Sequence, residues 1–275
     1  MTQEPTATFN FDYENPNIIE GHGTGDPYSH DLAATRLLRM LDALSGLPAG
    51  ATVMEVGCGA GRQSRTLKRL RPALQVFGCD LSQVAIVEAR KYNDGVEYDV
   101  SDAARLPYPD AQFDAVMLFD VLEHVPNVAA VVREVARVLK PGGLFHGYIP
   151  IEGQPHTIFA RLHSSQSLPL TRWKREQIGH IQQLTDTGVL ELFGQCGLKP
   201  QSYDYSFHLA GQLHDLADYW RRDRLAKSGL ADWRKNMVTI TARLIFFPLW
   251  RISYWEDKWR AHDNHAAGLH LTAVK

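Results

Sequence analysis

Short apolar runs alternate with helical patterns along most of the chain, and this alternation limits the folds that it can adopt. Apolar runs of strand length are each followed by about 10–15 residues with apolar side chains at helical spacing. Parallel strands need such crossover helices. The alternation therefore predicts a doubly wound, mainly parallel α/β sheet. The expected strands are 51–57, 74–80, 95–102, 112–120 and 144–150, and the expected helices are 31–45, 62–70, 82–92 and 127–140.

The last third of the sequence departs from this alternation. Residues 151–183 are polar and are expected to be irregular, and a helix is expected from Thr185 to Gly197. Strands are then expected at 200–209 and 268–275, with roughly sixty residues between them, far more than a hairpin turn takes. We therefore expect an inserted unit. The predicted division is a cap segment with the first helix at 1–45, a core at 46–209 with 268–275, and an inserted helical, aromatic-rich lobe at 210–267.

Composition narrows the class of protein. The chain has 275 residues, 44% of them hydrophobic, which suffices for one domain with an embellishment. Its formal charge of −2 gives no overall field that would attract nucleic acid, and we expect no nucleic-acid partner. Three cysteines without a CxxC pair, no signal-like start and no long apolar run favour a reduced, cytoplasmic protein without a metal site. Residues 221–260 nevertheless carry ten Lys or Arg against four Asp or Glu.

Three glycines stand close together after the first expected strand, in VMEVGCGAGRQS (53–64). Glycine at a strand-to-helix turn lets backbone amides approach a ligand that a Cβ atom would repel. Gly57 and Gly59 match the first two positions of the dinucleotide fingerprint GxGxxG, but Arg62 occupies the third. Arginine cannot provide the close helix-to-strand packing that this glycine allows. The sequence therefore disfavours an NAD-dependent oxidoreductase. Asp80 ends the second strand, where a carboxylate can accept hydrogen bonds from both hydroxyls of a ribose.

The pattern Glu55-x-Gly57-x-Gly59-x-Gly61 resembles motif I of the class I S-adenosylmethionine-dependent methyltransferases. The segment 113–143, with its proline-glycine turn, is similar to the region that follows this motif in the same family. The resemblance is dense over 53–150 and implies a Rossmann-like fold with a seven-stranded sheet and S-adenosyl-L-methionine as cofactor. The cofactor-binding positions that it implies are Glu55, Gly57, Cys58, Gly59, Gly61, Asp80, Leu81, Asp102, Ala103, Phe119 and Asp120.

The resemblance also implies roles within this set. Asp102 would bind the exocyclic amine of adenine, while the backbone amide of Ala103 meets a ring nitrogen. Phe119 and Asp120 would line the cofactor at the end of the fourth strand. Glu55 could bind the ammonium group of the cofactor, or it could orient the glycine loop by accepting backbone amides, and the second role is favoured.

The acceptor is less evident than the cofactor. Methyl transfer from a sulfonium is an in-line displacement in which the enzyme mainly aligns the reactants and excludes water. A base is required only if the acceptor is protonated in its resting state, as a phenol or an acidic carbon is. Histidines near the expected sheet edge are the candidates, with His180 ahead of His124, His146 and His156. An active-site histidine without a base function is the other interpretation.

Three interpretations of the lobe at 210–267 stay open. It holds five of the six tryptophans and an apolar helical stripe, which Pro248 should kink or end. The stripe could pack on the sheet domain, or the aromatic side chains could form a lid over a hydrophobic acceptor pocket. With its basic charge, the lobe could instead touch a membrane surface, which is the least favoured of the three. The stripe consists of Met237, Ile240, Leu244 and Phe247.

These observations favour a methyltransferase that uses S-adenosylmethionine and acts on a small, hydrophobic or lipid-like metabolite, with O- or C-methylation ahead. Two other classes stay open. One is an NAD-dependent oxidoreductase, and the other is a non-catalytic cofactor-binding or scaffold protein with the same fold. The sequence does not indicate an oligomeric state.

Overall fold

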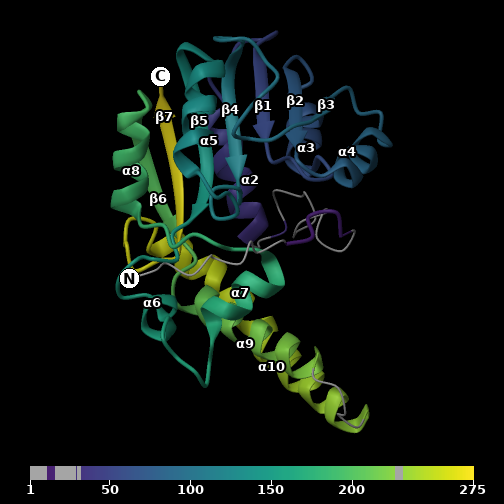
Figure 1. The fold of residues 1–275 in the computed structure, drawn as a ribbon, viewed down its shortest axis with the longest axis vertical. Helices are drawn as coiled ribbons and strands as arrows, with labels where there is room; N and C mark the ends of the chain where they lie inside the picture. The colour runs from purple at the N-terminus through teal and green to yellow at the C-terminus, as the bar shows by residue number, and fades with distance from the viewer. Residues whose placement is uncertain (1–10, 16–28, 30–31, 227–231) are drawn as a thin grey trace, which may run out of the picture.

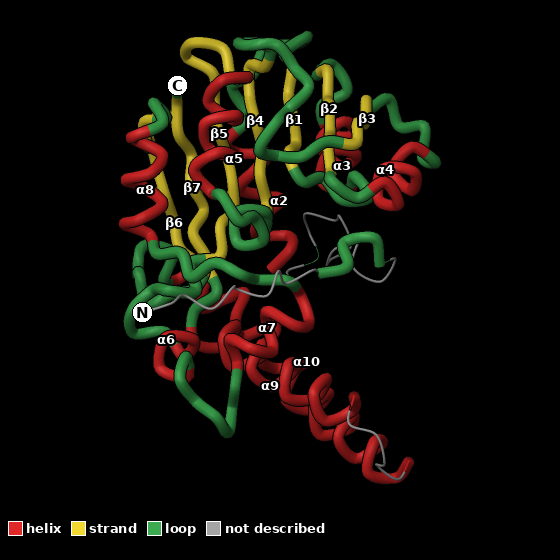
Figure 2. Tube along the Cα trace, viewed as in Figure 1, coloured by secondary structure: helices red, strands yellow, loops and turns green. Residues whose placement is uncertain are grey.

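A seven-stranded sheet forms the centre of the molecule (Figure 1, Figure 2). The structure, a computed structural model, describes residues 11–15, 29, 32–226 and 232–275. The strand order is β3-β2-β1-β4-β5-β7-β6; the pairs from β3 to β5 are parallel, and β7 runs antiparallel to both β5 and β6. This confirms the predicted doubly wound, mainly parallel α/β fold. The strands are β1 (Thr52–Val56), β2 (Gln75–Asp80), β3 (Glu97–Val100), β4 (Phe113–Phe119), β5 (Leu139–Pro150), β6 (Lys199–Ser206) and β7 (Gly268–Val274).

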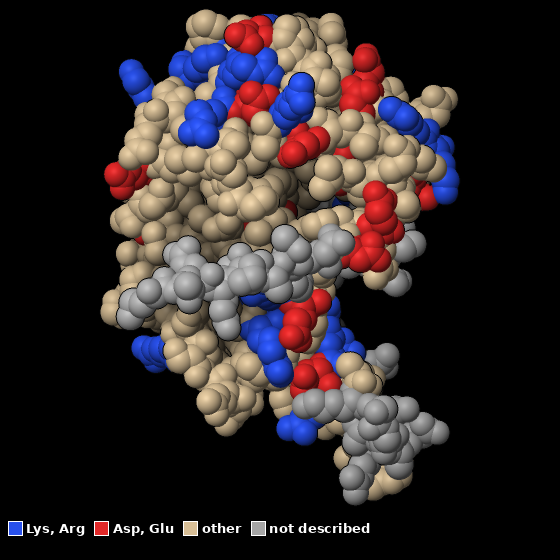
Figure 3. Space-filling model, in the orientation of Figure 1, with Lys and Arg blue, Asp and Glu red and all other residues tan. Residues whose placement is uncertain are grey.

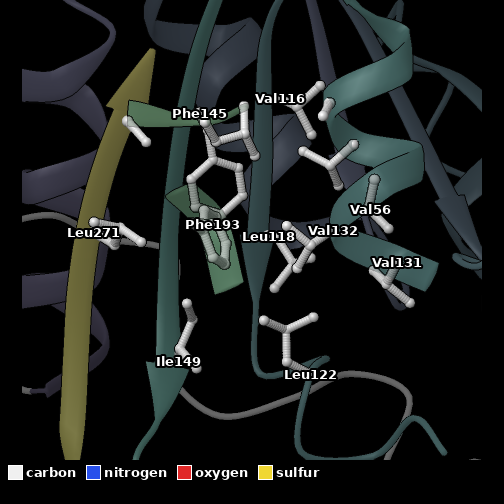
Figure 4. Close-up of a cluster of buried hydrophobic side chains, with 14 of the residues drawn as sticks. Val56, Val116, Leu118, Leu122, Val131, Val132, Phe145, Ile149, Phe193 and Leu271 are labelled. Atoms are coloured by element: carbon white, nitrogen blue, oxygen red, sulfur yellow. The ribbon is translucent and has the colours of Figure 1, made fainter. Parts of the chain in front are cut away.

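Helices cover both faces of the sheet, and β4 shows how each face is filled. Val116 and Leu118 belong to the apolar cluster on the face of α5 and α8, which Figure 4 shows. Ala115 and Met117 belong to the opposite cluster, with side chains of α2 and α3. Both faces of the strand are therefore buried, which explains its nearly continuous apolar sequence. These helices are α2 (Leu32–Ala43), α3 (Arg62–Leu70), α5 (Val128–Val138) and α8 (Asp186–Gln195), and α4 (Gln83–Arg90) follows β2.

The segment expected to be irregular, 151–183, contains two helices, α6 (Ile158–Leu162) and α7 (Leu170–Ile178), so that prediction was wrong there. Helix α7 buries Leu170 and Trp173 in a small apolar cluster that is separate from the two clusters on the sheet. Apart from Leu170, Trp173 and Ile178, the residues of α7 (LTRWKREQI) are charged or polar. Its apolar side chains are too few to establish a helical period, which is why the sequence pattern did not reveal it.

Two long helices, α9 (Leu209–Ala226) and α10 (Asp232–Trp259), extend side by side away from the sheet (Figure 1). Helix α10 does not end at Pro248, contrary to one of the two predicted outcomes. Met237, Ile240 and Leu244 are 55%, 53% and 72% exposed, so the prediction that their stripe packs on the sheet domain is wrong. The side chain of Phe247 lies outside the described residues. Helical spacing identified the apolar face of this helix but not what covers it.

The carboxyl-terminal part of α10 joins the pair to the rest of the molecule. Ser253 and Asp257 are buried there, and α10 contacts α2 and β6. His208 lies at the start of α9, fully buried, with its Nδ1 atom 2.7 Å from Asp257 Oδ1. A buried polar contact of this kind fixes how the two helices leave the sheet.

On the face shown in Figure 3, basic and acidic side chains are interspersed over the sheet domain. Within the described ranges, none of the helices combines the length and apolar character that crossing a bilayer requires.

Candidate active site

The glycine loop lies between β1 and α3, and its backbone requires glycine. Gly57, Gly59 and Gly61 have φ angles of 74°, 51° and 79°, in the left-handed region that other residues rarely adopt. A Cβ atom on Gly57 would overlap Val121, and one on Gly61 would overlap Tyr98. The sequence therefore leaves the backbone of this loop bare at the carboxyl end of β1, where parallel sheets bind their ligands.

Glu55, in β1, lies next to the glycine loop and contacts the helix that follows it. Its side chain is buried, and its Oε2 atom accepts hydrogen bonds from the Ser64 amide at 2.8 Å and from the Ser64 hydroxyl. Burial raises the pKa of the Glu55 carboxyl to about 7, although both hydrogen bonds oppose this shift. Both hydrogen bonds join Glu55 at β1 to Ser64 in the first turn of α3, directly after the glycine loop.

Asp80 joins the glycine loop to the end of β2. Its Oδ2 atom accepts a hydrogen bond from the Gly59 amide at 2.8 Å, and its Oδ1 atom accepts one from the Ser82 amide at 2.9 Å. Burial raises the pKa of this carboxyl. Leu81, the next residue, is 59% exposed. An exposed leucine beside a partly buried carboxylate offers an apolar surface next to a polar anchor.

Asp102 and Ala103 follow β3, the neighbour of β2. The amide of Ser101 donates to the Asp80 carbonyl at 2.9 Å, so the two strand ends lie side by side. The Asp102 side chain is exposed and accepts a hydrogen bond from the Ala104 amide at 2.8 Å. The described structure thus brings Asp80 and Asp102 to adjacent positions at the same edge of the sheet.

Phe119 and Asp120 lie at the end of β4. Phe119 is buried, and Asp120 has a φ of 52°, which turns the chain sharply after the strand. The Asp120 carboxylate pairs with Arg36 of α2, whose guanidinium lies 3.7 Å from the centroid of the Tyr148 ring. Arg36 was not predicted, because a single arginine on an amphipathic helix carries no functional signal.

A second group of polar residues lies beyond β4 and β5. Nδ1 of His180 is 2.6 Å from Oε1 of Glu152, and the same oxygen accepts a hydrogen bond from Lys174 Nζ at 2.7 Å. Lys174 and His180 together lower the pKa of the Glu152 carboxyl to about 2, against its burial. His180 Nε2 and His124 Nε2 each lie 3.7 Å from Oε1 of Glu123. Burial lowers the pKa of the His124 imidazole to about 3.

Residues 11–15 lie between these two groups. Oε1 of Glu14 accepts a hydrogen bond from the Gln83 amide at 3.0 Å, and its Oε2 accepts one from the Ser82 hydroxyl at 2.9 Å. The Tyr13 hydroxyl donates to the carbonyl of His124 at 3.5 Å. This short stretch therefore contacts both the Asp80 side and the His124 side of the sheet edge.

A family model described as a methyltransferase domain matches residues 54–146, which run from β1 into β5. Over this region the chain is similar to methyltransferases. The match covers the glycine loop, Asp80, Asp102 and Asp120, and it ends before α6. This match disfavours the NAD-dependent oxidoreductase. Arg62 at the third glycine position of the dinucleotide fingerprint disfavours it as well.

The curated relatives of the chain act on different small molecules, according to their names. The 27-O-demethylrifamycin SV methyltransferase of Amycolatopsis mediterranei is 37% identical over 133 residues, 46% of the chain and 48% of that protein. The ubiquinone/menaquinone biosynthesis C-methyltransferase of Desulfotalea psychrophila is 36% identical over 110 residues, 39% of the chain and 45% of that protein. The chain spans about half the length of these relatives.

Among solved structures, the cyclase SpnF shares the fold of this chain. Its TM-score is 0.57 at 22% sequence identity, and the match covers 88% of the chain and 80% of the cyclase. At this identity the likeness shows the fold alone. Because a cyclase has this fold, the reaction has to be argued from the residues at the site.

Two of the histidine candidates lie apart from the group around Glu123. His146 is buried within β5, 3.0 Å from the Thr272 hydroxyl, and burial lowers its pKa to about 4. His156 is exposed, and its ring lies 5.3 Å from that of His265. The structure therefore brings only His124 and His180 of the four candidates together, with ring centroids 4.8 Å apart.

An apolar depression of about 360 Å³ lies on the lobe at 210–267. Its lining comes from α9, α10 and the segment before α7, and none of it comes from the strand ends. It is therefore distinct from the glycine loop. The lining residues are Leu168, Leu213, Leu216, Ala217, Trp220 and Leu249.

Proposed function

We propose that the protein transfers a methyl group from S-adenosyl-L-methionine to a small, hydrophobic metabolite. The observation that carries this proposal is the hydrogen bond between the Gly59 amide and Asp80, within a loop of three left-handed glycines. The loop lies inside the matched methyltransferase domain, at 54–146. A bare backbone next to an anchored carboxylate supplies contacts for an amino-acid moiety and for a ribose in one crevice.

The residues present fit such a cofactor. Asp80 uses one lone pair on each oxygen for a backbone amide, so both oxygens keep a lone pair for ribose hydroxyls. Leu81 offers its exposed side chain to one face of the adenine, and Asp102 with Ala103 would read the adenine edge. When bound, the cofactor supplies a methyl group already activated by the positive sulfonium.

The other cofactor positions follow from the loop and from β4. The loop backbone would hold the methionine part, and Phe119 with Asp120 would line the adjoining wall. Glu55 acts indirectly through α3, because its oxygen is already bonded to Ser64. The loop residues in question are Gly57, Cys58, Gly59 and Gly61.

The acceptor side is formed by His180 and its neighbours. Because Glu152 holds Nδ1 of His180, the Nε2 atom is the one that can act on an acceptor, as a base or in binding. Relatives that methylate a rifamycin or a quinone precursor favour a hydrophobic acceptor with O- or C-methylation. In the proposed division of the chain, His180 and Glu152 belong to the cofactor-binding core, which comprises 46–209 with 268–275.

The lobe, 210–267, is proposed to cover the acceptor. Lys174 connects it to the site, since its Nζ lies 2.7 Å from Glu152 and 3.3 Å from Asp215 of α9. Glu152 in turn holds His180. The apolar depression on α9 and α10 provides a surface for a hydrophobic portion of the acceptor.

The test combines binding with turnover. S-adenosylhomocysteine should raise the melting temperature of the protein, whereas NADH should not. The protein should then release S-adenosylhomocysteine from S-adenosylmethionine when hydrophobic phenols or hydroquinones are added. Stabilisation by NADH alone would overturn the proposal. Tight cofactor binding without product across these acceptors would instead favour the non-catalytic alternative.

A further inference from the structure

We propose that Glu123, His124 and His180 form a binding site for one divalent transition-metal ion of the Zn²⁺ or Fe²⁺ class. Glu123 and His124 follow β4, and His180 follows α7. One donor atom from each residue lies within 4.8 Å of the other two. The sequence predicted no metal site, because the third ligand stands more than fifty positions after the first two and no known spacing connects them.

The Glu123 carboxylate is the first feature of this site that favours a cation. Its side chain is only 1% exposed, and neither oxygen has a hydrogen-bond partner among the described residues. A buried carboxylate without a partner is costly, and such groups are normally paired or bound to a metal. A cation bound at Glu123 would supply the missing partner.

The orientation of the two imidazole rings is the second such feature. Nδ1 of His124 lies 3.2 Å from the carbonyl oxygen of Gly179, which can only accept, so Nδ1 carries the proton. With the proton on Nδ1, Nε2 of the neutral imidazole presents a lone pair. That lone pair faces Oε1 of Glu123 at 3.7 Å. Two atoms with lone pairs, His124 Nε2 and Glu123 Oε1, thus face one another. A cation between them would bind both.

His180 repeats this arrangement. Its Nδ1 donates to the Glu152 carboxylate at 2.6 Å, and its Nε2 is directed at the same oxygen of Glu123, 3.7 Å away. A histidine that ligates a metal through Nε2 characteristically donates its Nδ1 proton to a carboxylate or a backbone carbonyl. His124 has the carbonyl and His180 has the carboxylate, so both rings are held in the tautomer that ligation requires.

The backbone holds the two halves of the site together. The amides of Ile181 and Gln182 donate to the carbonyl of Glu123 at 2.9 Å and 3.2 Å. In a tetrahedral zinc site with bonds of about 2.0–2.1 Å, two ligand atoms are about 3.4 Å apart. The two separations of 3.7 Å from Glu123 exceed this value by a few tenths of an ångström, and all three ligand atoms lie within 4.8 Å of one another.

Three protein ligands leave a coordination position open, as catalytic metal sites do. This part of the inference rests on the proposed function: the open position would take an oxygen atom of the acceptor, such as a phenol or an enol. His180 would then act as a ligand rather than as a base, because its Nε2 lone pair is used by the metal. The chemistry selects oxygen-bearing acceptors over purely hydrocarbon ones.

Titration of the metal-free full-length protein with Co²⁺ tests the site through the visible d–d absorption of a bound ion, with Zn²⁺ calorimetry alongside. We expect one equivalent with a mixed nitrogen and oxygen spectrum. Glu123→Gln, His124→Ala and His180→Ala should each weaken binding by about 100-fold or more, whereas His262→Ala, at an 89% exposed side chain, should not.

Binding of S-adenosylhomocysteine is measured on the same samples. Variants that retain this binding are folded, so their metal affinity can be interpreted even where one variant fails to fold. A wild-type protein that binds S-adenosylhomocysteine but gives no Co²⁺ spectrum would overturn the metal site and leave the proposed function intact. Equal binding by wild type and by the three ligand variants would show that Co²⁺ binds elsewhere, and it would equally reject the site.

Discussion

The helices of the sheet domain and the α9–α10 pair have similar apolar spacing but opposite surroundings. Val131 and Val135 of α5 are at most 1% exposed, because they pack on the sheet. Met237 and Leu244 of α10 are more than half exposed. Helical periodicity therefore specifies which face of a helix is apolar, whereas the fold around it decides whether that face is covered.

The two regions also differ in what they contribute to function. The matched methyltransferase domain, 54–146, lies wholly within the sheet domain and contains the glycine loop. The α9–α10 pair lies outside this match and contributes Asp215 to the contacts that lead to His180. In the proposed function, the sheet domain binds the cofactor, and acceptor choice resides where the chain departs from the match.

The largest expected difference between the regions is in stability. Phe193 of α8 is 1% exposed, and its ring centroid lies 4.8 Å from that of Phe145. Phe193→Ala should lower the free energy of unfolding by about 3–5 kcal/mol, because it leaves a cavity in the core. Leu244→Ala on α10 should change it by less than about 0.5 kcal/mol. Urea denaturation of both variants measures the contrast, and equal losses would mean that the α10 face is covered in solution.

A somewhat smaller effect is expected from the buried carboxyl of Glu55. Its pKa in the folded protein is about 7, raised from an ordinary value of 4.5. The folded state thus keeps a proton that the unfolded state has released, so stability falls as the pH rises from 4.5 through 7. Glu55→Gln removes this dependence. Relative to wild type, the variant should gain about 2–3 kcal/mol between pH 5 and pH 8.

The control for this experiment is Glu191→Gln, at an exposed position of α8. Its free energy of unfolding should follow that of wild type at every pH. If Glu55→Gln also ran parallel to wild type from pH 5 to pH 8, the Glu55 carboxyl would titrate normally and would not be the buried anchor of the loop.

The glycine loop gives the smallest of the three effects on stability. Gly57→Ala places a Cβ atom against Val121 at a φ of 74°, and it should cost about 1–2 kcal/mol. It should also weaken S-adenosylhomocysteine binding by at least about 10-fold, since the loop must shift. Gly194→Ala, in α8 with open space around its Cβ position, should be neutral or slightly stabilising. Calorimetry and thermal melting distinguish the two, and unchanged binding by Gly57→Ala would separate the loop from the cofactor.

Much of the sheet domain could be predicted because its signals are local. The β4 sequence is a continuous apolar run, and the carboxylate of Asp80 stands directly at a strand end. The same holds for the loop glycines, whose spacing is visible within seven residues. Such features need no knowledge of which distant segments meet.

The acceptor side could be predicted only in part. His180 and His124 were candidates, but the roles of Glu152 and Lys174 depend on how the segment after β5 folds back toward α7. Lys174 is almost fully buried, which contradicts the usual expectation for a lysine in a charged helix. Contacts of this kind join residues far apart in the sequence, so no local pattern reveals them.

In the proposed function, an adenosyl group binds at the carboxyl ends of β1 and β2, with its ribose held by Asp80. Isothermal titration of S-adenosylhomocysteine into Asp80→Ala tests it most directly, with Asp42→Ala on the exposed side of α2 as the matched control. Wild type and Asp42→Ala should bind with equal affinity, and Asp80→Ala should bind at least about 100-fold more weakly, because two ribose hydroxyls lose their acceptor. Equal affinity in all three proteins would contradict the account.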